Sequence, residues 1–512
     1  MNRTPPWRPV LALLCLLLMP LCAWWLDRPV SASRAADTCL GVPILSQAAY
    51  DALTLAPADG DIALYGGRTP ARDRASNTLY LSVRVPEGAK PCELEGTLRP
   101  ASRAGRLAFA PDEAFSRLSD AVAEGHAFTL LRLDGAGHAS ACRVILTPLT
   151  VVELLSDDPE NDDPYAEHTG RVRITEPGGT RQTDAAWHRR GMTTRLYKKA
   201  SLKLSMKKPL GHARNVAIAG LGSDDDWILN SMGMDDLRLR ELLLQRLWNA
   251  EAASADTLPM SAGAYAEVVI DGEYRGLYLL QRRVDAKYLQ LNTARDILLK
   301  GSNVLKPRRA AQAYTIRSSP PADAETLALA ETLFTLSDPS LIDLDSWLTM
   351  DVFSLFAGLY DNLSFKNAYY LLEPEANGYA VSFLPWDTDV AFGLDYVPGE
   401  GYLLLPTDED APILHRREYD ALLSLYPDLD ARLAERWRAL RAGTLSDDAL
   451  RDTLEGILHT LHQSGALARD QALWGVLRDG EDTVERMEAF LTRRLRQLDR
   501  LYGIEEPQHS FP

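Results

Sequence analysis

Two aspartates, Asp387 and Asp389, lie in the segment PWDTD, directly after an apolar run of the chain. Carboxylates at positions i and i+2 can face one divalent cation, and Mg²⁺ is commonly held by one or two carboxylates together with water and phosphate oxygens. Earlier in the chain, Asp361, Lys366 and Asn367 add a third acid, a cation and a carboxamide. In-line phosphoryl transfer needs such groups for positioning and charge neutralisation. The spacing therefore predicts a metal-assisted phosphoryl-transfer site.

The same residues allow two other interpretations. In a structural interpretation, Trp386 packs in a core and the two acids of PWDTD cap a turn or helix. The presence of Asp361 and Asn367 favours the functional interpretation, because the groups then complement one another. A metal-dependent hydrolase ranks third, since the sequence groups no histidine ligands or base with these acids.

A basic segment precedes the acids. Arg190 and Arg195 flank a turn that contains Gly and Thr, and Lys198, Lys199 and Lys203 lead into a predicted strand. Such a turn can offer backbone N–H groups and cations to polyphosphate oxygens. The sequence has no Walker-type loop, and a solvated basic hairpin is the competing interpretation. Each of the three lysines is a candidate for the phosphate contact.

The chain has 512 residues and a formal net charge of −16. A chain of this length is too long for one compact hydrophobic core, so it predicts about two to four structural units. The acidic balance and the lack of a basic stripe argue against a nucleic-acid partner, because nucleic acids are held chiefly by Lys and Arg on phosphates.

Residues 1–36 have the pattern of an export signal. Two arginines precede an apolar run from Val10 to Leu26, and small residues follow it. The run is slightly long for a cleaved signal peptide and short for a membrane span, while Trp24 and Trp25 suit the headgroup boundary of an uncleaved anchor. A signal peptide and a membrane anchor both stay open. Either one predicts an exported protein, secreted or membrane-anchored, with its body outside the cytoplasm.

Three cysteines, Cys39, Cys92 and Cys142, follow this segment. One disulfide among them is compatible with export, and the sequence leaves all three pairings open.

The hydrophobic pattern divides the rest of the chain. Short alternating apolar runs over residues 37–146 predict a small β-rich, sandwich-like domain. Beyond it, hairpin signatures and an amphipathic helix over Leu237–Trp248 predict a mixed sheet with a packed helix. After Ala322 the pattern is mainly helical, apart from the hairpin that carries the acids. We expect an α+β fold, with the second domain over 147–505 and a tail over 506–512.

The order of these segments resembles the spore coat protein H (CotH) kinase family over about residues 147–503. The matching elements are the basic turn and strand at 190–203, the Trp227 segment, the helix start at Asp235–Arg240, the motif Tyr274–Tyr278, Asp361 with 366–369, PWDTD followed by Phe392 and Gly393, and the helical tail. The resemblance implies an atypical, protein-kinase-like domain that uses ATP and Mg²⁺ or Mn²⁺. Its acceptors would be Ser or Thr residues of secreted, coat or surface proteins.

The resemblance also implies roles for single residues. Asp361 matches the aspartate that accepts the proton of the substrate hydroxyl. Asp387 matches the main metal ligand, with Asp389 nearby and Asn367 as a further candidate ligand. Either Lys203 or one of Lys198 and Lys199 would contact the phosphates, and Arg190 and Arg195 belong to the same cofactor-binding region.

The chain departs from the family at Arg282, where many members carry a Glu. If that Glu orients the phosphate lysine, its replacement removes an ion pair, and Arg282 can contact phosphate itself. The alternative function is therefore a catalytically weak or inactive binding or structural protein, displayed at the surface, on a kinase-like scaffold. The expected partners are a nucleotide and a protein with Ser/Thr-rich segments, with membrane attachment through the N-terminal segment as an option.

Overall fold

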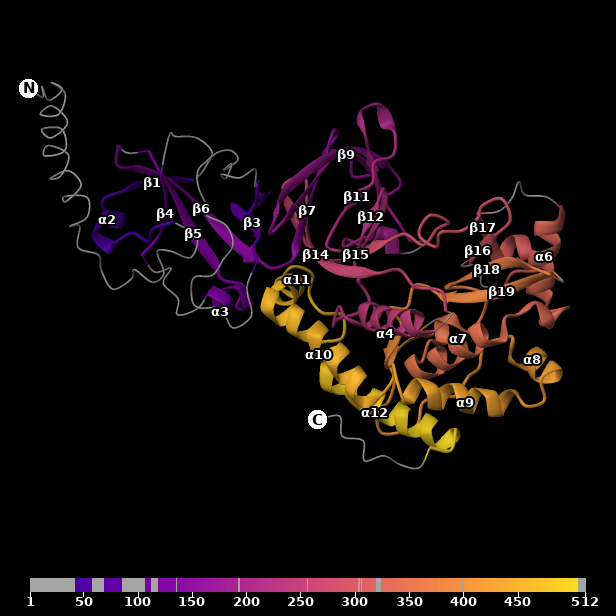
Figure 1. Ribbon diagram of the computed structural model, residues 1–512. Coiled ribbons are helices and arrows are strands. Elements are labelled where there is room, and N and C mark those ends of the chain that lie inside the picture. The colour runs from indigo at the N-terminus through magenta and orange to yellow at the C-terminus, as the bar shows by residue number, and fades with distance from the viewer. Residues whose placement is uncertain are drawn as a thin grey trace, which may run out of the picture.

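The computed structural model describes most of the chain (Figure 1). The described residues are 42–57, 69–84, 106–111, 118–134, 136–191, 194–255, 257–302, 304, 306–318, 324–376, 378–397 and 400–504. The predicted leader at 1–36, the tail at 506–512, and Cys39 and Cys92 lie outside them. Among the helices of these ranges, none combines the length and the apolar character needed to cross a membrane.

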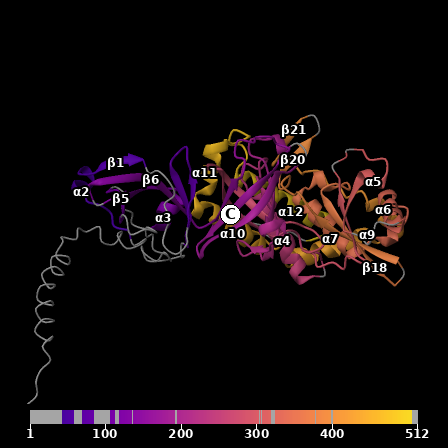
Figure 2. The ribbon, with the colours of Figure 1, turned by 90° about the horizontal axis from the view of Figure 1, so that it is seen from above.

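The predicted α+β class is confirmed. An N-terminal sheet, a closed barrel and a helix-rich part with a second sheet follow one another in a row, as two perpendicular views show (Figures 1 and 2). Helices α10 (Asp447–Ser464) and α11 (Ala466–Trp474) lie beneath the barrel, on the side of the N-terminal sheet (Figure 1).

The N-terminal sheet has the strand order β2-β3-β6-β5-β4, and β1 pairs with β6. Its elements are α2 (Gln47–Asp51), β1 (Thr54–Pro57), β2 (Ala71–Asp73), β3 (Thr78–Ser82), β4 (Arg106–Phe109), α3 (Leu118–Ala123), β5 (Ala127–Leu133) and β6 (His138–Thr147). Leu79 and Leu81 of β3 meet Val144 and Leu146 of β6 in a buried core. Cys142 belongs to this core; its thiol is free, and burial raises its pKa to about 11.

The barrel closes in the order β10-β13-β15-β14-β7-β8-β9. Its strands are β7 (Thr150–Ser156), β8 (Glu167–Glu176), β9 (Gly179–Arg189), β10 (Leu202–Lys207), β13 (Asp226–Asn230), β14 (Gly263–Ile270) and β15 (Glu273–Arg282), with a separate pair β11 (Val216–Ala217) and β12 (Ser223–Asp224). Alternate residues of a strand point to opposite faces. Leu202, Leu204 and Met206 fill the barrel core. Lys203 therefore points away from the barrel interior.

The remaining chain forms a second sheet, a two-stranded ribbon and most of the helices. The sheet has the order β17-β16-β18-β19, and β20 pairs with β21. The elements are α4 (Arg240–Ser254), β16 (Ile297–Gly301), α5 (Ala310–Ala313), β17 (Tyr314–Ser318), α6 (Ala324–Thr335), α7 (Leu344–Ala357), β18 (Ala368–Glu375), β19 (Gly378–Pro385), β20 (Leu394–Val397), β21 (Gly401–Leu404), α8 (Tyr419–Leu425), α9 (Leu429–Arg441), α10 (Asp447–Ser464), α11 (Ala466–Trp474) and α12 (Val484–Leu501). One core joins the second sheet and the helices, and Trp248, Trp347 and Trp437 are fully buried in it.

Helix α4 begins at Arg240, later than the predicted Leu237. Arg238 has a φ of 56°, which a right-handed helix excludes. Asp235 caps the shifted start, because its Oδ2 accepts from the backbone N–H groups of Leu239 at 2.7 Å and Arg240 at 2.8 Å. The predicted helix start is therefore wrong by three residues: Leu239 is the N-cap residue and its side chain makes no cap hydrogen bond, while Asp235 reaches the start of the helix from four residues earlier in the chain.

Helix α11 is fastened to the barrel by buried charges. The fully buried Asp470 accepts from Lys199 Nζ at 2.6 Å and from Arg238 Nε at 2.9 Å. It also accepts from the backbone N–H of Leu277 at 2.9 Å. Gly276 permits this approach, since a Cβ at that position, with its φ of 89°, would lie 2.3 Å from Asp470 Oδ1. The glycine of the Tyr274–Tyr278 motif thus allows β15 and α11 to come into close contact.

Replacing Asp470 by alanine is expected to destabilise the protein, because it leaves two buried cations without their counter-charge. Removing one partner of a buried ion pair typically costs about 3–5 kcal/mol. Denaturant unfolding followed by circular dichroism measures the change. The matched control is Asp452→Ala on α10, where the side chain is exposed, and its effect should stay within about 0.5 kcal/mol. Equal effects of the two substitutions would contradict this assignment.

Candidate active site

The antiparallel pair β18–β19 brings the predicted acids to one place. Ala368 pairs with Pro385 at the open end of this hairpin, and the backbone N–H of Trp386 donates to Asn367 O at 3.0 Å. Asn362 ties a third segment to both ends: its Nδ2 donates to Asn367 O at 2.9 Å and to Trp386 O at 3.0 Å. The segment after α7 and the two hairpin ends therefore form one unit.

Asp361 lies in a short 3₁₀ turn, η5 (Tyr360–Asn362), and directly precedes Asn362 in the chain. Lys366 Nζ forms an ion pair with its Oδ1, and Asn367 Nδ2 donates to its Oδ2 at 2.7 Å. The side chains of Asp361 and Lys366 are 20% and 21% exposed, so solvent and substrate can reach them. An accessible carboxylate of this kind can accept a hydroxyl proton. The sequence prediction of Asp361, Lys366 and Asn367 as neighbours is thus matched by a direct contact.

Asp387 and Asp389 follow directly after β19. Asp387 is exposed and has a φ of 56°, a left-handed conformation that is uncommon outside glycine and that clusters at functional sites. Asp389 is partly buried, and burial raises its pKa well above the usual range. The neighbouring acids Asp387, Glu241, Asp235 and Asp361 add to the rise. Mutual repulsion of this kind is relieved when a cation binds among the carboxylates.

The donor set at the open end of the hairpin consists of two carboxylates and one carboxamide, Asp387, Asp389 and Asn367. Within the described residues, no group of three or more His, Cys, Asp or Glu side chains is arranged to hold a metal ion. Mg²⁺ usually takes one or two carboxylates and completes its shell with water and phosphate oxygens. Asp387 and Asp389 can supply the carboxylates. Because Asn367 Nδ2 donates to Asp361, the Oδ1 atom is the part of that carboxamide left to ligate a cation.

Glu241 was missed by the sequence reasoning, although it holds the PWDTD segment. It is buried at the start of α4, and its Oε2 accepts from the backbone N–H and the hydroxyl of Thr388 at 2.7 and 2.8 Å. Its Oε1 accepts from Gln245 and Gln281, each at 3.0 Å. Burial, followed by the charge of Asp387, raises its pKa. An acid in the first turn of a helix is ordinary, so the sequence carried no signal for this contact.

Two cations meet at Trp386, beside Asp387. Lys300 Nζ lies 4.8 Å from the ring centroid, and the guanidinium carbon of Arg190 lies 5.4 Å from it. Lys300 is the penultimate residue of β16 and is not among the cations predicted from the sequence. Burial, then Arg190, lower the pKa of Lys300 to about 7, while Asp387 acts in the opposite direction. A lysine with a shifted pKa beside an acid is a candidate functional group.

The other predicted cations lie elsewhere. Lys203 Nζ is 3.3 Å from Asp226 Oδ2, and Lys199 forms an ion pair with the buried Asp470. Arg282 pairs with Asp224 at 3.1 Å, and its guanidinium also covers the ring of Tyr288.

Lys198 and Arg195 belong to the loop between β9 and β10. Lys198 is exposed, and its carbonyl accepts from Arg275 at 2.7 Å. Arg195 Nε donates to Gly191 O at 2.8 Å, and its guanidinium lies over Tyr165. Among the described contacts of the six predicted cations, that of Arg190 with Trp386 is the one that reaches PWDTD.

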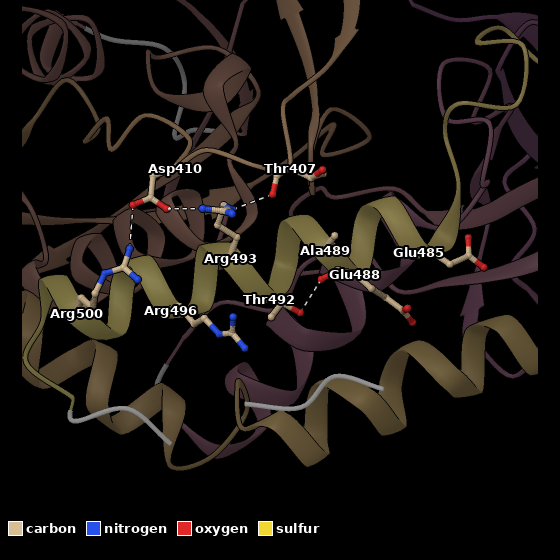
Figure 3. A pocket seen from close by; sticks show the side chains of 9 residues that line it. All are labelled: Thr407, Asp410, Glu485, Glu488, Ala489, Thr492, Arg493, Arg496 and Arg500. Carbon is tan, nitrogen blue, oxygen red and sulfur yellow. Dashed lines mark hydrogen bonds and ion pairs between the residues drawn. The ribbon is translucent and has the colours of Figure 1, made fainter. Parts of the chain in front are cut away.

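A separate groove of about 430 Å³ runs along α12 (Figure 3). In the figure, Arg493 and Arg500 turn towards Asp410, while Glu485 and Glu488 lie further along the same helix. Arg500 pairs with Asp410 at 2.9 Å, and Arg493 Nε donates to Thr407 O at 2.8 Å. None of the predicted site residues lines this groove. Arg493 and Arg500 are thus engaged with Asp410, and the groove is separate from the acids of the predicted site.

Comparison with known families identifies one match. The model of a family described as CotH kinase protein matches residues 188–498, which is more than half of the chain. The match begins near the end of β9, so it starts later than the resemblance read from the sequence and leaves β7 and β8 outside. The comparison with curated proteins finds no match.

Replacing Asp389 by asparagine is expected to raise the melting temperature when metal and nucleotide are absent, because the substitution removes a carboxyl group that burial, and then the neighbouring acids, make costly to ionise. The raised pKa of Asp389 means that the folded protein loses stability as the pH rises from the unfolded value of about 3.9 through the folded value. The gain should therefore be larger at about pH 8 than at about pH 5. Thermal unfolding at both pH values tests this, with the exposed Asp408→Asn as the control. A gain that does not depend on pH would contradict the electrostatic cause.

Glu241→Ala is expected to loosen the PWDTD segment, since two hydrogen bonds to Thr388 are lost and buried donors are left without acceptors. Each such donor costs about 1–3 kcal/mol. Hydrogen exchange of the Thr388 amide should become faster, whereas the amides of the N-terminal sheet serve as an internal reference. Unchanged protection of the Thr388 amide would show that Glu241 does not position this segment.

Proposed function

Because this chain belongs to the CotH kinase family, we propose that it is an exported, atypical protein kinase that transfers the γ-phosphate of ATP to Ser or Thr. The acceptors would be secreted, coat or surface proteins. One observation carries the proposal: the hairpin β18–β19 gathers Asp361, Asp387 and Asp389 at its open end, next to Lys366 and Lys300.

In this proposal Asp387 and Asp389, with Asn367, would hold Mg²⁺ or Mn²⁺ against the phosphates of ATP, where the metal neutralises charge. Asp361 accepts the proton of the acceptor hydroxyl. The acceptor oxygen then forms a bond to the γ-phosphorus, the bond from that phosphorus to the bridging oxygen breaks, and ADP leaves with the electron pair. Lys366 lies beside Asp361. Its positive charge would stabilise the negative charge on the oxygens of the transferred phosphoryl group.

The two sides of this site would act as lobes. Arg190 directly follows β9 of the barrel, and its contact with Trp386 spans from the barrel to the second sheet. The barrel with α4 would form one lobe of a kinase-like domain, and the second sheet with the C-terminal helices the other. The N-terminal sheet would be a separate β-rich domain, and residues 1–36 would direct export as a signal peptide or anchor.

The proposal predicts that the full chain transfers labelled γ-phosphate from ATP to a Ser-rich protein or to itself. Asp387→Ala should lower the transfer by a factor on the order of 10²–10³, as loss of a transition-state charge contact does. ATP with Mg²⁺ or Mn²⁺ should also stabilise the wild type by about 2.7 kcal/mol at a hundred times its Kd. Asp408→Ala is the control, since its side chain is exposed.

Equal labelling by Asp387→Ala would remove the metal assignment. A chain that ignores ATP in the presence of either metal would instead favour the alternative, a surface-displayed binding protein without catalysis.

A further inference from the structure

A cavity of about 510 Å³ lies between four segments of the chain. Tyr197 comes from the loop after β9, Met234 from the segment before α4, Tyr402 from β21, and Trp474 and Leu477 from the end of α11 and the loop beyond it. These segments come from the barrel, from the ribbon β20–β21 and from the C-terminal helices, so the cavity exists only in the folded chain.

The walls of the cavity are mainly apolar and stay accessible. Tyr197 is 36% exposed and Leu477 57% exposed, which is unusual for large apolar residues that share one concave surface. The ring of Trp474 is fixed, because its Nε1 donates to Arg275 O at 3.0 Å and the guanidinium of Arg275 lies over it. The cavity thus offers a preformed surface for a bulky side chain.

Its charged lining is cationic. Lys198, Lys199, Arg238 and Arg478 line it, and no acidic side chain does so in the described part of the chain. Lys199 and Arg238 are neutralised by Asp470, and Arg478 lies 3.2 Å from Asp236. Lys198 is exposed. A triphosphate needs several available cations, whereas this arrangement suits one carboxylate.

The ribbon β20–β21 connects the cavity to the catalytic acids. It follows PWDTD in sequence, and β20 packs against η5, the turn that carries Asp361. Tyr402 on β21 lines the cavity. Burial raises the pKa of Tyr402, and the charges of Asp389, Asp387 and Asp361 contribute to that rise. Because β21 pairs with β20, and β20 packs against the turn that carries Asp361, a polypeptide in the cavity would lead towards Asp361.

We propose that this cavity binds the acceptor polypeptide and selects a bulky apolar residue together with an acidic residue near the phosphorylated Ser or Thr. The apolar residue would lie against Trp474, Tyr197 and Leu477, and the carboxylate would meet Lys198. The inference rests on the proposed kinase function and adds the class of substrate to it.

A peptide library with a central Ser tests the proposal on the full chain. One flanking position at a time is fixed as Phe, Ala, Asp or Lys, and transfer from labelled ATP is measured. The wild type should favour Phe at one position and Asp at another. For the best peptide, Leu477→Glu should raise KM by about tenfold or more with kcat retained, because a charge then faces the apolar residue in the pocket. Lys198→Glu should change the preference from Asp to Lys.

The matched control is Leu473→Glu. Leu473 is a similarly exposed leucine on α11, 45% exposed, and it does not line the cavity. Its KM should equal that of the wild type. Both Leu477→Glu and Lys198→Glu should keep the stabilisation of the chain by ATP, which is measured by thermal unfolding without peptide.

The outcomes separate the two proposals. Stabilisation by ATP and transfer to peptides without any preference, or equal KM values for Leu477→Glu and Leu473→Glu, would overturn the acceptor cavity alone. A loss of stabilisation by ATP in Lys198→Glu would assign Lys198 to the nucleotide and would also overturn it. A wild type that neither responds to ATP nor labels any peptide would overturn both proposals.

Discussion

The burial of Asp389 among other carboxylates is the constraint on which the site depends. Burial is the largest cause of the raised pKa of Asp389, and the charges of Asp387, Glu241, Asp235 and Asp361 raise it further, so the ionised form of this carboxyl group is unfavourable in the unliganded fold. The acids stay together because other groups fix the backbone. Asn362 binds the carbonyls at both hairpin ends, and Glu241 holds Thr388 between the two aspartates. The left-handed backbone of Asp387, with its φ of 56°, likewise persists only where the surrounding structure determines the conformation.

The surrounding packing has the required rigidity. Helix α7 leads to Asp361 and is buried over most of its length, with Trp347, Phe353 and Phe356 fully inside the core. Helix α4 carries Glu241 and is held at its start by Asp235. Arg240 joins this start to the C-terminal part of the chain through Asp482, at 2.6 Å. The groups that position PWDTD thus belong to elements with little freedom to move, which is how a site keeps like charges at close range.

The sequence predicted those parts of the site that lie close together in the chain. Asp361, Asn367 and Asp387 flank one hairpin, and antiparallel pairing necessarily brings its ends together. Contacts between distant segments carried no such signal. Glu241 looks like any acid in a first helical turn, and Lys300 looks like the end of a buried strand. The local pattern placed Lys199 at the lead into a predicted strand. Its partner Asp470 lies far along the chain and determines its role.

Arg282, where many family members carry a Glu, also has a partner from a distant segment of the chain. A missing Glu at this position matters if the phosphate lysine depends on it. Here the buried lysine of the basic turn, Lys199, has Asp470 as its counter-ion. Arg282 has its own partner in Asp224, which is fully buried and is also paired with Lys287. The substitution therefore changes an ion pair at the end of β15 and leaves the charges around Asp361 and Asp387 as they are. It does not by itself argue against catalysis by this chain.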